Sequence, residues 1–296
     1  MRQLLRKYEL KPHRYEKHGK VTFIDTEKGR FALKPKTDNQ KIYEYLDSRS
    51  FNYYPRIIST EEDKYEITEY IEPIEMPIEQ KAQDMIDLIS LLHNKTTYYK
   101  EVDEADYKKI YEDIRNNIEY LYSYYNDIMT VIETRIYMSP SEYLLARNIS
   151  KIYASLNFCK NELEVWYNII KEKRKQRFVV LHNNLNLDHF IRNKGAYLTS
   201  WNKAKIDIPI FDIYKLYRRT ALDLDFSEIF RRYESNYPLL PEEKKLFFIL
   251  IALPDKIEFD DKEYEMCKRI SNQLDLLYKT DIFLSPYYPK QEEPNK

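Results

Sequence analysis

Several polar side chains that could take part in chemistry lie between residues 180 and 191, where the chain reads Val-Leu-His-Asn-Asn-Leu-Asn-Leu-Asp-His-Phe-Ile. Asn184 is neutral near pH 7 and cannot accept a proton as a carboxylate does. His189 is a poor ligand for a hard cation such as magnesium. The acidic residues nearest to Asn184 and His189 in the sequence are Asp188 and Asp207. The segment therefore holds few groups suited to base catalysis or to magnesium binding.

Short strands and one helix are predicted before residue 72. Turn signals at His18-Gly19 and Glu27-Lys28-Gly29 separate the first strands, and an amphipathic helix follows that ends near Ser48. The predicted strands cover residues 13–18, 20–25, 30–34, 56–59 and 65–70. Together they predict a five-stranded sheet with one helix.

Helical spacing dominates after a proline-marked crossover at residues 72–77. Ser139-Pro140-Ser141-Glu142 combines an N-cap serine, a proline at the first helical position and a glutamate at the third, which predicts a helix start. Further helices are predicted at residues 86–92, 107–136, 211–222, 241–252 and 262–279. This part of the chain should therefore form a mostly helical region.

Segment 180–191 resembles the catalytic loop of small-molecule kinases of the aminoglycoside phosphotransferase and choline kinase type. In that superfamily an apolar strand runs into His-Gly-Asp-Leu-x-x-x-Asn, followed by a hairpin and an Ile-Asp pair. His182, Leu185, Phe190 and Ile191 keep this frame. Four further segments match in the same order, at residues 29–34, 59–72, 91–96 and 201–213. Their order and spacing look most similar to the CotS-type spore coat proteins, a branch of this superfamily.

The resemblance implies roles for four residues. Lys34 would pair with nucleotide phosphates, and Glu44 on the following helix would orient Lys34. His182 would support the loop by hydrogen bonding, and Asp212 would brace the loop backbone. For Lys34 and Glu44 the alternative is that both are solvated surface charges.

The resemblance also implies that the reactive positions are degenerate. The base position is Asn184, the metal-Asn position is His189 and the metal-Asp position is Ser200, so no catalytic residue is intact. No metal site is expected, with Asp188 and Asp207 as weak candidates for a relocated ligand. Their alternative roles are to cap a turn and to begin the turn at Pro209.

The predicted fold class is α+β, a protein-kinase-like two-lobed fold. Residues 1–72 would form the N-lobe, residues 73–77 the hinge and residues 78–290 the helical C-lobe. Residues 291–296 would form a disordered tail.

Three functions are compatible with this reading. The first is a pseudokinase of the CotS type, a catalytically impaired binding or scaffold protein linked to spore coat assembly, with a coat protein as partner and with ATP or ADP bound without tight magnesium. The second is an ATP-dependent small-molecule phosphotransferase with relocated metal ligands. The third, a cross-linked structural protein, rests only on the 29 tyrosines, which are spaced like packing residues.

Composition excludes several other classes. The 296 residues include 48 basic and 49 acidic side chains, so no net charge favours nucleic acid as a partner. No apolar run reaches about 18 residues, so no membrane span is expected. The two cysteines, Cys159 and Cys267, are far apart and predict neither a disulfide framework nor a zinc site. We expect a cytoplasmic protein, associated with spores if the CotS resemblance holds.

Overall fold

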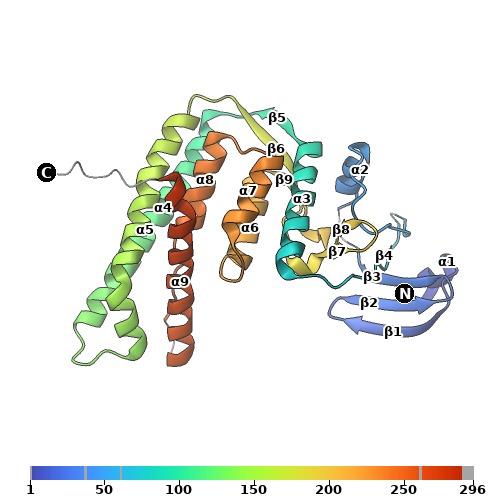
Figure 1. The fold of residues 1–296 in the computed structure, drawn as a ribbon, viewed down its shortest axis with the longest axis horizontal. Coiled ribbons are helices and arrows are strands. Elements are labelled where there is room, and N and C mark those ends of the chain that lie inside the picture. Colours follow the sequence, from blue (N-terminus) through green and yellow to red (C-terminus); the bar gives the residue numbers. More distant parts are fainter. Residues whose placement is uncertain (1, 37–38, 61, 260–261, 289–296) are drawn as a thin grey trace. The chain divides into compact units, whose positions relative to one another are not determined.

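Helices and small antiparallel sheets build the chain, as predicted for an α+β protein (Figure 1). The computed structural model describes residues 2–36, 39–60, 62–259 and 262–288. The tail predicted at residues 291–296 lies outside this part of the chain. The chain divides into two compact units: residues 1–98, 178–212 and 232–237 form the first, and residues 99–177, 213–231 and 238–296 the second. The boundary predicted at residues 73–77 lies inside the first unit.

A four-stranded antiparallel sheet begins the first unit, in the order β1 (Pro12–His18), β2 (Val21–Thr26), β3 (Gly29–Pro35) and β4 (Tyr65–Glu69). The fifth strand predicted at residues 56–59 is irregular. It forms a single bridge between Ile57 and Thr68, with Ile58 N–H donating to Ile67 O at 2.8 Å. A regular ladder is not formed there, although the segment lies beside β4 as expected.

The alternation of side chains along β3 and β4 creates two different faces of the sheet. Phe31, Leu33 and Ile67 are buried on one face, in a core with Leu5 and Leu10. Leu5 belongs to the short helix α1 (Arg2–Lys7), and Leu10 follows that helix. The register pairs Lys34 with Glu66 and Ala32 with Thr68, so these four side chains share the other face. One face of the sheet therefore packs in the hydrophobic core, and the other face is left to line a cavity.

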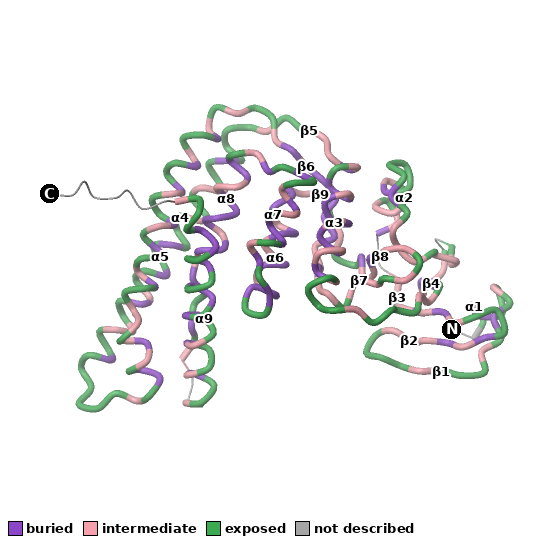
Figure 2. The backbone as a smooth tube through the Cα atoms, in the orientation of Figure 1, coloured by how far each residue is buried: buried purple, intermediate pink, exposed green. Residues whose placement is uncertain are grey.

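The remaining elements of the first unit hold the segment singled out in the sequence. They are α2 (Gln40–Ser48), α3 (Ile78–Thr96), the end of β6 (Lys175–Leu181), β7 (Phe190–Arg192), β8 (Ala196–Leu198) and β9 (Lys205–Asp207). Two single-turn helices, η1 (Leu187–His189) and η2 (Trp201–Lys203), lie between the strands. Val179, Val180 and Leu181 of β6 are buried and pair with β9. Figure 2 shows that buried positions also run along α3.

Long helices dominate the second unit. They are α4 (Glu104–Glu133), α5 (Pro140–Ile170), α8 (Pro241–Ala252) and α9 (Glu263–Leu284), and α5 packs against the other three. The predicted start of α5 is confirmed, since Ser139 is its N-cap and forms a capping box with Glu142. Strand β5 (Tyr98–Glu101), α6 (Ile210–Thr220), α7 (Phe226–Asn236) and η3 (Ser285–Tyr287) complete the described elements. Neither α1 nor α7 was predicted from the sequence.

No helix in the described ranges has the length and hydropathy required to cross a membrane.

Candidate functional site

The segment at residues 182–184 is held from behind by one buried carboxylate. Asp212, in the first turn of α6, accepts hydrogen bonds from the backbone N–H of His182 at 2.8 Å and of Asn183 at 2.6 Å. Asn183 has a φ of 59°, in the left-handed region that asparagine tolerates better than most residues. The carboxylate thus stabilises a sharp turn where β6 ends.

Two further buried side chains fix this carboxylate. The hydroxyl of Tyr233 lies 2.7 Å from His93 Nδ1, and His93 Nε2 lies 3.3 Å from Asp212 Oδ2. A tyrosine O–H donating to Nδ1 leaves the proton on Nε2, where it faces the carboxylate. All three side chains are buried, so we call Tyr233, His93 and Asp212 the bracing network. His182 adds a contact from its Nε2–H to the Thr199 carbonyl at 2.7 Å.

Asn184, His189 and Ser200 lie together on the other side of this turn. His189 Nδ1–H donates to the Asn184 carbonyl at 2.7 Å, which leaves the lone pair of Nε2 as an acceptor. Asn184 Nδ2 lies 3.5 Å from the Ser200 carbonyl, too far for a strong hydrogen bond. The loop geometry therefore brings Asn184, His189 and Ser200 close to one another.

Ser200 has a strained backbone. Its φ of 64° and ψ of 45° lie in the left-handed region, which costs a residue with a side chain about 1 kcal/mol or more. The next residue, Trp201, is buried, and its carbonyl accepts a hydrogen bond from Asn39. The neighbouring packing holds Ser200 in this conformation.

Lys34 pairs with Glu66 and not with Glu44, which corrects the prediction. Lys34 Nζ lies 2.9 Å from Glu66 Oε1, and the Glu66 side chain is only 7% exposed. Glu44 is exposed on α2, with Gln40 Nε2 as a distant partner at 3.4 Å. The side chain of α2 that faces the pair is Tyr43, whose pKa is raised by burial and by the nearby Glu66 carboxylate.

A cavity of about 250 Å³ lies between the free face of the sheet and the loop. Val21, Ala32, Ile71 and Ile191 supply aliphatic walls, and Phe23 and Tyr70 supply aromatic ones. We call this cavity the front cleft. Its walls suit a flat heteroaromatic ring, although its volume is below the roughly 300 Å³ at which sites for drug-sized ligands begin.

The polar lining of the front cleft is acidic. Lys34 is the one lysine or arginine among the described lining residues, against the carboxylates of Glu66, Glu69 and Asp188. His189 and Ser200 line it as well. Asp207 is not among the lining residues; its carboxylate contacts Lys205 and accepts from the Ile208 amide at 2.8 Å. Of the two weak metal candidates, only Asp188 faces the cleft.

This donor set does not fit a magnesium ion held as in an active kinase. Magnesium prefers carboxylate and phosphate oxygens in octahedral geometry, while the positions concerned offer an amide, an imidazole and a hydroxyl. Of the described residues between 180 and 191 that line the front cleft, only Asp188 carries a carboxylate, and Asp188 is exposed. Phosphate binding by the hairpin of β1 and β2 is also limited, because its turn consists of only Gly19 and Lys20.

Glu66 and Tyr43 are the site residues that sequence reasoning missed. Glu66 could have been found from its place opposite Lys34, but the long connection between β3 and β4 leaves their register unspecified. The position of Tyr43 depends on the rotation of α2 about its axis. Helical spacing does not reveal that rotation when several residues of the helix are apolar.

Solved structures with the same fold are phosphotransferases. An aminoglycoside phosphotransferase from Alicyclobacillus acidocaldarius has a TM-score of 0.70 and 11% identity, covering 97% of this chain and 94% of its own. A spectinomycin phosphotransferase bound to AMP has a TM-score of 0.53 and 12% identity, covering 100% and 96%. Its complex with ADP and spectinomycin has a TM-score of 0.50 and 13% identity, covering 99% and 94%.

No protein-family model and no curated protein matches the chain. The likeness to the solved structures establishes the fold alone, at identities of 11–13%. The chain therefore has a protein-kinase-like α+β fold of the aminoglycoside phosphotransferase kind, and the predicted fold class is confirmed.

Proposed function

We propose that this chain is a pseudokinase, a kinase-fold protein that binds ligands or partners without transferring phosphate. The observation that carries the proposal is the loop beside the front cleft. His189 and Ser200 line the cleft, and Asn184 is hydrogen-bonded to His189 through its carbonyl. By the kinase resemblance these three residues stand at the base and metal positions. A neutral amide cannot take the proton from an attacking hydroxyl, and these three positions supply no carboxylate to hold magnesium.

The ligand of the front cleft is a purine nucleotide or nucleoside held without magnesium. The aliphatic walls at Val21, Ala32 and Ile191 and the rings of Phe23 and Tyr70 support binding of a base. Lys34 is the cation for a phosphate, but Glu66 already neutralises it. A bound phosphate would therefore compete with Glu66, so we expect weak binding of ATP and little benefit from magnesium.

Calorimetric titration with adenosine, ADP and ATP, each with and without magnesium, tests this function. Wild type should bind at least one of them with an affinity that magnesium leaves unchanged within about twofold. Lys34→Ala should alter the binding of the phosphorylated ligands only, and Lys36→Ala, two residues along the same chain segment, is the matched control. Failure of all three ligands to bind would contradict the nucleotide part of the proposal.

Repair of the loop tests whether the chemistry alone has been lost. The triple variant Asn184→Asp, His189→Asn and Ser200→Asp adds two carboxylates to the loop, one of them at Ser200 in the lining of the front cleft. Magnesium should then strengthen ATP binding by about tenfold or more, because the ion can bridge these carboxylates and the phosphates. An unchanged response to magnesium would mean that the cleft differs from an active kinase in shape as well as in charge.

The alternative function is an ATP-dependent phosphotransferase with relocated metal ligands. The observation that favours it is the position of Asp188, which lines the front cleft beside His189. Transfer of labelled phosphate from ATP to a metabolite mixture, lost in Asp188→Asn and in Lys34→Ala, would establish this alternative and overturn the pseudokinase proposal.

A role in spore coat assembly rests on the CotS resemblance. In a spore-forming host, a fluorescent fusion of the chain should collect at the surface of the developing spore and should depend there on a coat protein. A fusion that stays evenly distributed through the mother cell would remove this part of the proposal.

A further inference from the structure

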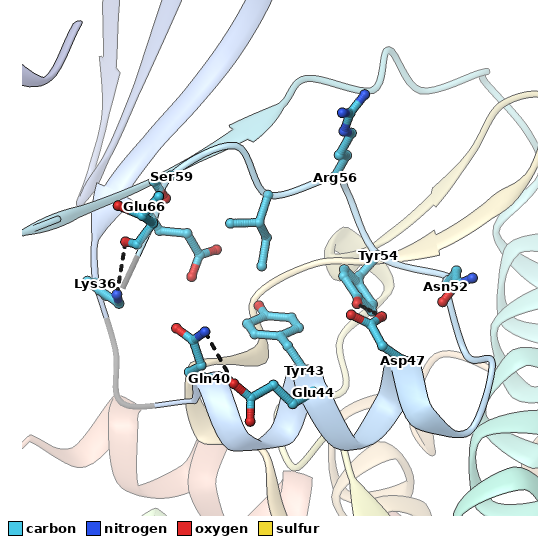
Figure 3. A pocket seen from close by; sticks show the side chains of 12 residues that line it. Lys36, Gln40, Tyr43, Glu44, Asp47, Asn52, Tyr54, Arg56, Ser59 and Glu66 are labelled. Carbon is cyan, nitrogen blue, oxygen red and sulfur yellow. Dashed lines mark hydrogen bonds between the residues drawn. The ribbon is translucent and has the colours of Figure 1, made fainter. Parts of the chain in front are cut away.

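A second cavity, of about 430 Å³, is lined by residues of α2, of the segment 52–60 and of β4, together with Lys36. Figure 3 shows it between α2 and the end of the sheet, and we call it the rear cavity. Tyr43 and Glu66 line both the rear cavity and the front cleft. These two side chains are therefore a shared wall between two sites.

Carboxylates face the rear cavity from two elements. Glu66 comes from β4, and Glu44 and Asp47 come from α2, where a spacing of three residues puts both on one side of the helix. In Figure 3 the Glu66 side chain reaches toward Gln40 and Tyr43. Because the Glu66 side chain is buried, a cation close to it is screened far less by solvent than one at the surface.

The two basic residues of the lining are directed to other groups. Lys36 Nζ donates to the Thr60 carbonyl at 3.1 Å. The Arg56 side chain is 80% exposed, lies 3.9 Å from Glu69 Oε1 and points away from the cavity in Figure 3. The lining of the rear cavity therefore holds three carboxylates against two cations, one of which is hydrogen-bonded to a backbone carbonyl of the lining and the other of which is largely exposed.

Two tyrosines add aromatic surface for a cation. The rings of Tyr43 and Tyr54 lie 4.9 Å apart, and the Tyr54 hydroxyl donates to Asp47. Aromatic faces attract ammonium groups by about 0.5–2 kcal/mol, depending on how far the cation is desolvated. Burial raises the pKa of both phenols, so they remain neutral hydrogen-bonding groups at physiological pH.

We propose that the rear cavity binds a small organic diammonium ion, with one ammonium at Glu66 and the other at the acids of α2. An ammonium at Glu66 competes with Lys34 for the same carboxylate. Lys34 is then released toward a phosphate in the front cleft. The diammonium ion therefore strengthens the binding of a phosphorylated ligand, and by thermodynamic linkage that ligand strengthens binding of the diammonium ion equally.

Binding of the diammonium ion alone is tested by calorimetry with putrescine, with butanediol as the uncharged probe of the same length. Putrescine should bind and butanediol should not. Glu66→Gln should weaken putrescine binding at least tenfold. The double variant Glu44→Gln and Asp47→Asn, which changes only exposed acids, should weaken it at least threefold. Glu79→Gln, at an exposed acid of α3 that lines neither cavity, should leave putrescine binding unchanged.

Several results would overturn the site. Equal binding of putrescine and butanediol, no binding of putrescine, or equal losses in Glu79→Gln and in the double variant would each do so. Since the double variant leaves the buried Glu66 in place, it keeps the test valid even if Glu66→Gln does not fold.

The coupling between the two sites rests on the proposed function, because it needs a phosphorylated ligand in the front cleft. Saturating putrescine should lower the Kd of ADP about fivefold or more and leave the Kd of adenosine unchanged. Putrescine binding without any effect on ADP would overturn the coupling. Absence of ADP binding with putrescine still bound would instead count against the proposed function and leave the rear cavity site standing.

Discussion

The bracing network lies on one side of the turn and Asn184, His189 and Ser200 lie on the other, and the two groups of residues differ in burial and in bonding. Tyr233, His93 and Asp212 are buried and joined by hydrogen bonds to each other and to the backbone of His182 and Asn183. Asn184, His189 and Ser200 are half-buried and contact mainly backbone carbonyls.

This difference separates what the fold requires from what phosphoryl transfer requires. A buried carboxylate that accepts two backbone N–H groups cannot be replaced without leaving those donors unsatisfied. A half-buried side chain at a cleft can change, because water replaces its lost contacts. The turn can therefore keep its shape while the side chains on its cleft side vary, and substitutions on the two sides should have unequal effects.

The largest effect is expected for Asp212→Asn. An amide can accept from only one of the two backbone donors, and its NH₂ group would face the other, so unit 1 should lose about 3 kcal/mol of stability. Urea unfolding checks this in a Trp166→Phe background, where the fluorescence of the buried Trp201 reports on the first unit alone.

Asp207→Asn is the control for this change. Asp207 is partly exposed, and its carboxylate contacts Lys205 near the same loop. We expect a loss below about 1 kcal/mol. A similar loss in both variants would mean that burial does not distinguish the bracing network from its surroundings.

A smaller effect is expected for His189→Ala, on the side of the turn that lines the front cleft. The variant loses one hydrogen bond to the Asn184 carbonyl, and water can replace that contact, so unit 1 should lose about 1 kcal/mol. The same fluorescence assay measures it. A loss as large as that of Asp212→Asn would remove the contrast between the two sides.

The smallest effect, and one of opposite sign, is expected for Ser200→Gly. Glycine adopts the left-handed conformation without a steric penalty, but it also gains freedom in the unfolded chain. A net stabilisation of about 0.5 kcal/mol should result. Thr199→Gly, next in the chain but without a positive φ, is the control and should destabilise.

The loop was predictable from sequence because its spacing is local. The intervals from His182 to His189 and on to Ser200 place these residues together in any chain that follows β6 with this turn and hairpin. The start of α5 was predictable for the same reason, since its capping box spans four consecutive residues.

The partner of Lys34 was not predictable, because it depends on relations between distant segments. The pairing with Glu66 requires the register of β3 against β4, and the exclusion of Glu44 requires the rotation of α2. Periodicity reports that a strand or a helix forms, but not how it is shifted or turned against its neighbours. The strand predicted at residues 56–59 is irregular, and its irregularity also depends on a distant segment. Ser59 Oγ accepts a hydrogen bond from the Ile67 amide at 3.0 Å, where a regular ladder would use a backbone carbonyl.

The two-residue turn between β1 and β2 has a consequence for the speed of ligand exchange. His18 and Val21 are paired, so the hairpin has no longer loop at its tip that could fold over the front cleft as a flap. A ligand of the kind proposed for the front cleft would then enter and leave without waiting for a slow opening motion of microseconds to milliseconds. We expect association at the ordinary rate of about 10⁵–10⁷ M⁻¹s⁻¹ and single-exponential release, with affinity set almost entirely by how quickly the ligand departs.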